Sequence, residues 1–391
     1  MSALELWGWD DRWADAFAPA AAAGLVPARV IAQHRGRWLL AAESGEFPGL
    51  VTGKFRHDAA TGDLPAVGDW VGFVPLPGQP NAAAPLDTAA SEARSTVRDE
   101  PPSRGNVSFG GDAAQIDVVL PRRTALTRRA AGSRVMMQVV AANVDTLFVA
   151  TSLNADLNPR RLERYVAMGR ESGAETVVIL TKADLVDDGD AAVTSLAEEL
   201  RVAVVALSGH TGDGLEALAD WLAPGRTVAL VGSSGVGKST LLNRLAGEEL
   251  MATTEIREND AQGRHTTTHR ELFLLPGGAL LLDTPGMREL GLWDADEGVD
   301  ETFADLIDLA SRCRFADCSH RLEPGCALQA EVRAGRLDDA RVMSYRRLSH
   351  EVAEQPSTIA AKREKDRRFG KSVRNAAAES TARKAFKDGD Y

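Results

Sequence analysis

Two short segments, and the order in which they occur, restrict this 391-residue chain more than any other feature. The first reads Gly-Ser-Ser-Gly-Val-Gly-Lys-Ser over residues 232–239 and has the G-x-x-x-x-G-K-S spacing of a phosphate-binding loop. An apolar strand predicted over 227–231 precedes it and a helix predicted over 240–246 follows, which is the context such a loop requires. Backbone N–H groups would surround the phosphates, Lys238 would neutralise their charge, and the Ser239 hydroxyl would coordinate Mg²⁺.

The second segment, Thr181-Lys182-Ala183-Asp184, ends a strand predicted over 176–180. The Asp184 carboxylate can accept from both N1–H and the exocyclic amine of guanine, a pair that adenine cannot complete because its N1 is an acceptor. The Lys182 stem would lie against the base and ribose. Ser208-Gly209 follows the next predicted strand, where a backbone N–H can reach guanine O6, and Gly209 departs from the Ser-Ala that is common there.

The guanine-reading segment precedes the phosphate-binding loop, whereas ordinary GTPases have the opposite order. The sequence therefore predicts a circularly permuted α/β P-loop domain whose strands and helices alternate. Because ligands bind at the carboxyl ends of parallel strands, the permutation leaves both loops at one edge of the sheet. The predicted strands cover 144–150, 176–180, 202–206, 227–231, 271–275 and 279–282, and the predicted helices cover 160–172, 191–200, 214–222 and 240–246.

A second apolar strand ends at Asp283-Thr-Pro-Gly286, where Asp283 would hold Mg²⁺ and the Gly286 N–H would meet the γ-phosphate. Thr267, 28 positions after Ser239, lies in a Gly-Arg-His-Thr-Thr-Thr segment and can complete the Mg²⁺ shell, although a solvated turn explains this segment equally well.

Met287 follows Gly286, where many GTPases carry a glutamine that orients the attacking water. A thioether cannot do this, so another group must, and His265 is the nearest candidate. The alternative is that His265 is an ordinary surface histidine. Slow basal turnover follows, because no arginine finger is evident in cis.

All three cysteines lie within 14 residues, in the pattern Cys313-x₄-Cys318-x-His320-x₅-Cys326. Three thiolates and an imidazole form a closed tetrahedral shell that suits one structural Zn²⁺ rather than a catalytic metal. Free buried thiols are the alternative.

The N-terminal part predicts a small β-barrel, with the oligonucleotide-binding (OB) type as the leading candidate. A segment rich in Ala and Pro interrupts it, and several arginines follow that would suit RNA or a solvated linker. The predicted domains are an N-terminal extension over 1–27, an OB barrel over 28–135 with an insertion over 78–112, a permuted GTPase domain over 136–298, and a zinc-binding helical domain with a basic tail over 299–391. The predicted strands of the barrel cover 28–32, 37–41, 50–54, 67–74 and 115–120, and the arginines are Arg122, Arg123, Arg128, Arg129 and Arg134.

The net charge of −11 argues against a chain that coats nucleic acid uniformly. Residues 341–391 nevertheless contain 13 Lys/Arg and 7 Asp/Glu, so the C-terminal part carries +6 and the rest −17. Such a tail either meets a polyanion or forms a solvated charged helix. The Ala-rich run over 18–25 is too short to span a bilayer, and we expect a cytoplasmic monomer with no membrane partner.

Taken together, these motifs resemble one family, the ribosome small-subunit-dependent GTPase A family, from about residue 28 to the C-terminus. The resemblance implies an OB barrel, a circularly permuted GTPase domain and a zinc-binding helical domain. It also implies GTP hydrolysis stimulated by the 30S subunit, action late in maturation of that subunit, contact with 16S rRNA, and a water-positioning role for His265. The GTP-binding residues would be Thr181, Lys182, Ala183, Asp184, Ser208, Gly209, Gly232, Ser233, Ser234, Gly235, Val236, Gly237, Lys238, Ser239, Thr240, Asp283 and Gly286, with Lys238, Thr267 and His265 in hydrolysis.

Two rival hypotheses remain from the residues themselves. One is a GTPase that serves another partner, such as a metal-delivery or tRNA-modification factor. The other is an RNA-binding assembly factor in which GTP orders the fold without being hydrolysed. If the segment after Gly286 responds to the γ-phosphate, we further expect the nucleotide to control the pose of the cysteine-containing region.

Overall fold

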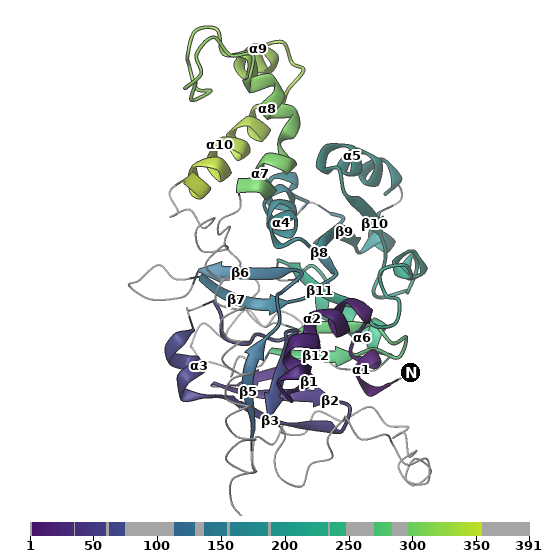
Figure 1. Ribbon diagram of the computed structural model, residues 1–391. Helices are drawn as coiled ribbons and strands as arrows, with labels where there is room; N and C mark the ends of the chain where they lie inside the picture. Colours follow the sequence, from purple (N-terminus) through teal and green to yellow (C-terminus); the bar gives the residue numbers. More distant parts are fainter. Residues whose placement is uncertain are drawn as a thin grey trace, which may run out of the picture.

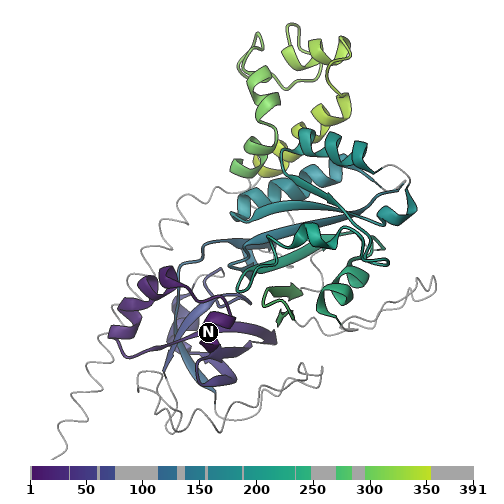
Figure 2. The ribbon, with the colours of Figure 1, turned by 90° about the vertical axis from the view of Figure 1, so that its right-hand side faces the viewer.

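The computed structural model describes residues 2–34, 36–59, 62–74, 113–129, 137–154, 157–186, 189–233, 235–247, 270–283 and 296–353. The predicted insertion, the segment with His265 and Thr267, and the basic tail beyond residue 353 lie outside these ranges. Figures 1 and 2 show three regions in succession: a barrel, a sheet covered by helices, and a C-terminal group of helices.

Five strands form the predicted N-terminal barrel, in the order β1-β2-β3-β5-β4, and pairing between β1 and β4 closes it. Trp38, Phe73 and Ile116 fill its interior. Thr52 ends β3 because its hydroxyl accepts a hydrogen bond from the Phe55 amide at 2.9 Å and so caps the short helix α3. The strand expected over 50–54 therefore lies earlier in the chain, over Gly45–Val51, and residues 53 and 54 belong to α3. The elements are β1 (Val26–His34), β2 (Arg37–Ala42), β3 (Gly45–Val51), α3 (Gly53–Asp58), β4 (Trp70–Val74) and β5 (Ala114–Val119).

The N-terminal extension forms two helices, α1 (Ala3–Leu6) and α2 (Asp11–Ala22), which pack against the barrel. Trp13 and Phe17 on α2 are buried beside Trp70 of β4. Asp10 caps α2 by accepting from the Trp13 amide at 2.9 Å. The first five residues of the Ala-rich run over 18–25 thus form the end of α2.

The second region is a sheet of six strands in the order β10-β9-β8-β11-β13-β12, all parallel except β12. The phosphate-loop strand β11 lies at its centre, between β8 and β13. Alternate residues face opposite layers: Leu147 and Val149 lie in one apolar cluster with α4 and α5, while Phe148 lies in another with α6 and η2. The bounds are β8 (Thr146–Ser152), α4 (Pro159–Ser172), β9 (Glu175–Thr181), α5 (Asp190–Leu200), β10 (Ala203–Ala206), η2 (Leu215–Leu218), β11 (Thr227–Gly232), α6 (Lys238–Ala246), β12 (Arg270–Leu274) and β13 (Leu280–Asp283).

Strand β1 joins the barrel to this sheet, because its last residues pair with β12 while its first residues pair with β4. The buried Arg29 of β1 secures the same junction: it donates to the Trp7, Gly68 and Asn143 carbonyls and, at 2.8 Å, to the Thr227 hydroxyl at the start of β11. Burial lowers the pKa of Arg29 to about 10. The hairpin of β6 (Ala125–Arg129) and β7 (Met137–Ala142) lies between the two regions, where the sequence had predicted a linker or a basic face.

The C-terminal helices α7 (Asp296–Thr302), α8 (Ala304–Ala310), α9 (Ala327–Arg333) and α10 (Asp339–Ala353) stand on α4 (Figure 1). Phe303, Leu306 and Leu348 belong to the same apolar cluster as the α4 face of the sheet. Gly298 permits this contact, because a Cβ there would lie 2.2 Å from the Ala167 carbonyl oxygen of α4. Among the described helices, none has the length and apolar character that a membrane crossing requires.

Candidate functional site

The guanine-reading segment is in direct contact with the phosphate-binding loop. Thr181, buried at the end of β9, donates its hydroxyl to the Val236 carbonyl and, at 3.1 Å, to the Thr151 carbonyl. The threonine of the upstream motif therefore supports the loop that lies 55 positions later. This contact assembles the site despite the inverted order.

The two base-reading loops lie side by side, because β9 and β10 are parallel neighbours. Lys182 adopts a left-handed conformation with φ of 60°, and the Ala183 amide donates to the Leu207 carbonyl at 3.2 Å. Asp184 is exposed, as a side chain that must reach a base requires. Ser208 is buried, and its hydroxyl accepts from the amides of His210 and Thr211, at 3.2 and 3.1 Å.

Close packing explains the glycine at position 209. A Cβ there would lie 3.2 Å from the Leu241 amide nitrogen and 3.5 Å from the Thr240 carbonyl carbon, both in the first turn of α6. The loop after β10 thus packs on the helix that begins the phosphate site, and alanine would crowd it.

The phosphate-binding loop runs from the end of β11 to the start of α6. Lys238 donates its ammonium to the Gly232 carbonyl at 2.8 Å and to the Ser233 carbonyl. Ser239 and Thr240 follow in the first turn of α6, where free backbone N–H groups and the helix dipole favour phosphate. Arg161 of α4 reaches the same loop and donates to the Ser233 hydroxyl at 2.8 Å. No motif in the sequence pointed to Arg161.

Several predicted site residues lie outside what the structure describes. These are Ser234, His265, Thr267 and Gly286, and for Asp283 only the backbone is described. Asp283 ends β13, which pairs with β11, so its backbone lies at the carboxyl edge beside the phosphate loop. The roles of these residues stay predictions.

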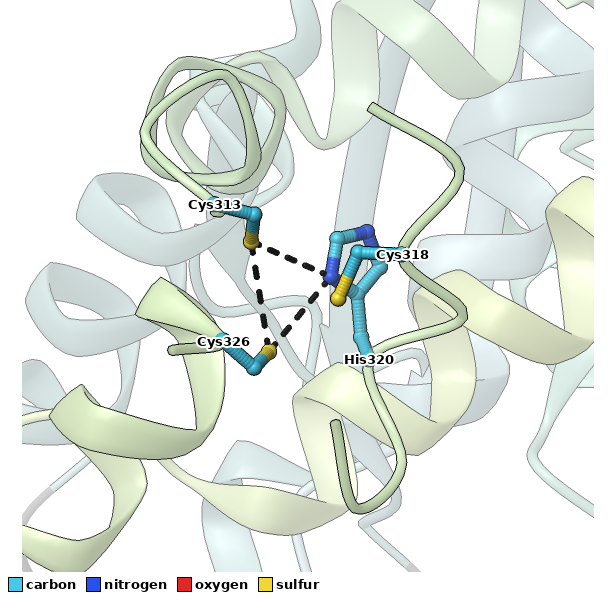
Figure 3. Close-up of side chains that lie close together, drawn as sticks. All are labelled: Cys313, Cys318, His320 and Cys326. Atoms are coloured by element: carbon cyan, nitrogen blue, oxygen red, sulfur yellow. Dashed lines mark hydrogen bonds between the residues drawn. The ribbon is translucent and has the colours of Figure 1, made fainter. Parts of the chain in front are cut away.

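The four predicted metal ligands converge at the C-terminal end of the molecule (Figure 3). Their donor atoms all lie within 4.8 Å of one another. His320 Nδ1 is 3.6 Å from the sulfurs of both Cys313 and Cys326, and these two sulfurs are 4.0 Å apart. A tetrahedral Zn²⁺ with its usual bond lengths requires separations of about 3.6 Å for N to S and about 3.8 Å for S to S. The cluster therefore fits a Zn²⁺ ion.

The surrounding groups hold this cluster in shape. The Glu323 carboxylate accepts from the amides of Ser319, Arg321 and Leu322, and the bond from the Ser319 side chain contributes most to lowering the pKa of Glu323 to about 2. Desolvation and the neighbouring thiols raise the pKa of Cys318 to about 11, so a metal must displace its proton on binding.

Two of the arginines that suggested an RNA-binding face have structural partners instead. Arg122 is buried and forms a two-pronged ion pair with the buried Asp69, at 2.7 and 2.6 Å. Arg123 pairs with Asp10 and stacks over the ring of Trp13, 3.9 Å from its centroid. Arg122 thus stabilises the barrel, and Arg123 attaches the N-terminal extension to it. Neither residue lies in a solvated linker or on a free basic face.

The chain is similar in sequence to known proteins over most of its length. The family model described as RsgA GTPase matches residues 119–293. The small ribosomal subunit biogenesis GTPase RsgA of Opitutus terrae is 47% identical over 366 residues, which cover 92% of this chain and 93% of that protein. The protein of the same name from Streptomyces coelicolor is 41% identical over 355 residues, covering 90% and 87%.

Solved structures share the fold. YjeQ from Thermotoga maritima superposes with a TM-score of 0.54 at 24% identity, covering 85% of this chain and 100% of that one. YloQ, a circularly permuted GTPase, superposes with a TM-score of 0.52 at 22% identity, covering 85% and 96%. The motifs, the strand order and the identity over most of both chains agree, and this chain belongs to the RsgA GTPase family.

Proposed function

We propose that this protein hydrolyses GTP to GDP and phosphate and acts in biogenesis of the small ribosomal subunit. The observation that carries the proposal is the contact of Thr181 with Val236, which joins a guanine-reading segment to a phosphate-binding loop. Relatives that match over about nine-tenths of this chain are named small ribosomal subunit biogenesis GTPases.

The site residues take the following roles in this proposal. Asp184 reads the guanine edge, the Lys182 stem lies against the base, and the loop at Ser208 and Gly209 supplies a backbone N–H to O6. Lys238 and the amides of the loop bind the β- and γ-phosphates. His265 orients the attacking water, because Met287 cannot.

Two metals complete the proposal. Ser239, Thr267 and Asp283 would hold Mg²⁺, which stabilises the charge that develops on the phosphates. Cys313, Cys318, His320 and Cys326 would hold one structural Zn²⁺ that closes the C-terminal helices around it.

The proposed partner is the 30S subunit with its 16S rRNA, met in the cytoplasm by a monomer of this chain. Co-sedimentation with purified 30S and 50S particles tests the partner, and binding to 30S alone is expected. Equal recovery with both particles, or with neither, contradicts it.

The nucleotide is tested by Asp184→Asn. An asparagine amide cannot accept both guanine donors but can donate to the C2 carbonyl of xanthine, so the variant should lose GTP hydrolysis and gain XTP hydrolysis. Single-turnover hydrolysis by His265→Ala separates a GTPase from a factor that merely binds GTP. If the wild-type chain releases no phosphate from GTP, the hydrolytic function is wrong.

A further inference from the structure

Helix α4 carries three arginines near its start, and they have different partners. Arg160 contacts the carboxylates of Glu163, Glu199 and Asp338, with the Glu199 bond at 2.6 Å. Arg164 forms a two-pronged pair with Glu351 of α10, at 2.7 Å for both bonds.

Arg161 differs from both neighbours. Its guanidinium is exposed and donates to the Ser233 hydroxyl at 2.8 Å, and within the described part of the chain it forms no ion pair. Asn158 fixes the start of α4 by accepting from the amides of Arg160 and Arg161, at 3.0 and 3.2 Å. A guanidinium with no ion pair among the described residues is therefore held beside the phosphate-binding loop, which must bind a polyanion.

Ser233 is contacted from two sides. Its hydroxyl accepts from Arg161, and its carbonyl accepts from the ammonium of Lys238, the residue predicted to neutralise the β- and γ-phosphates. Displacement of Ser233 thus changes both the shape of the loop and the position of Lys238. The planar fork of an arginine suits this double task, since it can hold a hydroxyl and direct its remaining donors to phosphate oxygens.

The same helix supports the C-terminal helices. The Gly298 amide of α7 donates to the Glu171 carboxylate at 3.2 Å, and Arg341 of α10 contacts Asp305 and lies 3.9 Å from the buried Glu163 of α4. Helix α4 therefore contacts both the C-terminal helices, which contain the metal-ligand cluster, and Ser233. This connection does not involve the segment after Asp283.

We infer that Arg161 is a positioning residue for the phosphate-binding loop: it holds Ser233, favours GTP over GDP through its charge, and links the pose of the C-terminal helices on α4 to the triphosphate site. This inference rests on the proposed GTP hydrolysis. It supplies a cationic group in cis that the sequence motifs did not reveal.

The test compares the full-length wild type with Arg161→Ala, Arg161→Lys, Ser233→Ala and the double variant. Arg336→Ala is the control, because it removes an exposed arginine that follows α9 and pairs with Glu331 rather than with the phosphate-binding loop. The readouts are kcat, KM and the ratio of the GTP and GDP dissociation constants, measured with fluorescent nucleotides.

Arg161→Ala should lower kcat at least tenfold and reduce the preference for GTP over GDP at least threefold, with Arg161→Lys intermediate. Ser233→Ala should have a smaller effect. The double variant should resemble Arg161→Ala, because both substitutions remove the same hydrogen bond between Arg161 and Ser233. A kcat and a GTP-to-GDP ratio within twofold of the wild type in Arg161→Ala overturn the inference. Wild-type protein that does not hydrolyse GTP would instead reject the proposed function.

Discussion

Thr181 and Val236 are joined by a hydrogen bond from the threonine hydroxyl to the valine carbonyl, and this bond links the two halves of a permuted nucleotide site. Thr181→Val keeps the side-chain volume but removes the donor, which leaves two buried carbonyls, of Val236 and Thr151, without it. An unpaired buried polar group costs about 1–3 kcal/mol. We expect GTP to bind roughly tenfold more weakly. Thr181→Ser, which keeps the hydroxyl, should bind GTP as the wild type does, and equal dissociation constants for Val and Ser contradict the role.

The buried pair of Asp69 and Arg122 should dominate the stability of the barrel junction. Asp69→Asn removes the carboxylate that pairs with Arg122, in a site where the two side chains are 0% and 3% exposed. Breaking one partner of a buried pair costs about 3–5 kcal/mol. Urea unfolding should show this loss. Glu331→Gln, in an exposed pair with Arg336, is the control and should leave the midpoint unchanged. A similar, small effect of both substitutions would show that the junction tolerates the unpaired arginine.

The metal-ligand cluster should contain one zinc ion per chain, measured on purified protein by elemental analysis. Glu323→Gln weakens the scaffold that positions the loop between Cys318 and Cys326, because its carboxylate accepts three backbone amides. Loss of such a supporting group typically weakens metal affinity by about 10–100-fold. Asp317→Asn, an exposed residue directly before Cys318, is the control and should keep wild-type affinity. Protein that folds and unfolds identically with and without zinc contradicts a structural metal.

Gly298→Ala tests the contact of the C-terminal helices with α4. The added methyl would lie 2.2 Å from the Ala167 carbonyl oxygen and 2.9 Å from the Glu171 amide nitrogen, so one helix must move. Overpacking of this kind costs about 1–3 kcal/mol. We expect a lower melting temperature and faster proteolysis within α7 to α10. Gly277→Ala, with nothing within 4 Å of the added atom, is the matched control. Unchanged proteolysis in Gly298→Ala would mean that the helices are not held by this contact.

The sequence predicted the structure best for motifs whose chemistry requires a fixed spacing between residues. The strand–helix alternation, the phosphate-binding loop and the cysteine pattern predicted the permuted domain and the metal-ligand cluster, and the structure brings these residues together. Ion pairs between residues far apart in the chain could not be predicted in this way. Arg122 and Arg123 looked like a basic surface, but their partners Asp69 and Asp10 lie far away in the chain.

Predictions of helices from the local sequence pattern were also wrong where tertiary contacts determine the extent of a helix. The helix predicted over 214–222 is only the 3-10 turn η2, and in the C-terminal region α9 and α10 are separated around Gly335. Gly335 has φ of 70°, a left-handed conformation that ends the first helix. The expected control of the C-terminal helices by the nucleotide stays a prediction, and the contact of Arg161 with Ser233 gives it a physical route.

The measurement that tests the central claim most directly is the rate of GTP hydrolysis by the full chain titrated with purified 30S subunits, with 50S subunits as the control. We predict a slow basal rate that rises by orders of magnitude and saturates with 30S, and does not rise with 50S. A rate unchanged by 30S subunits, at concentrations where the chain hydrolyses GTP unaided, would contradict the account.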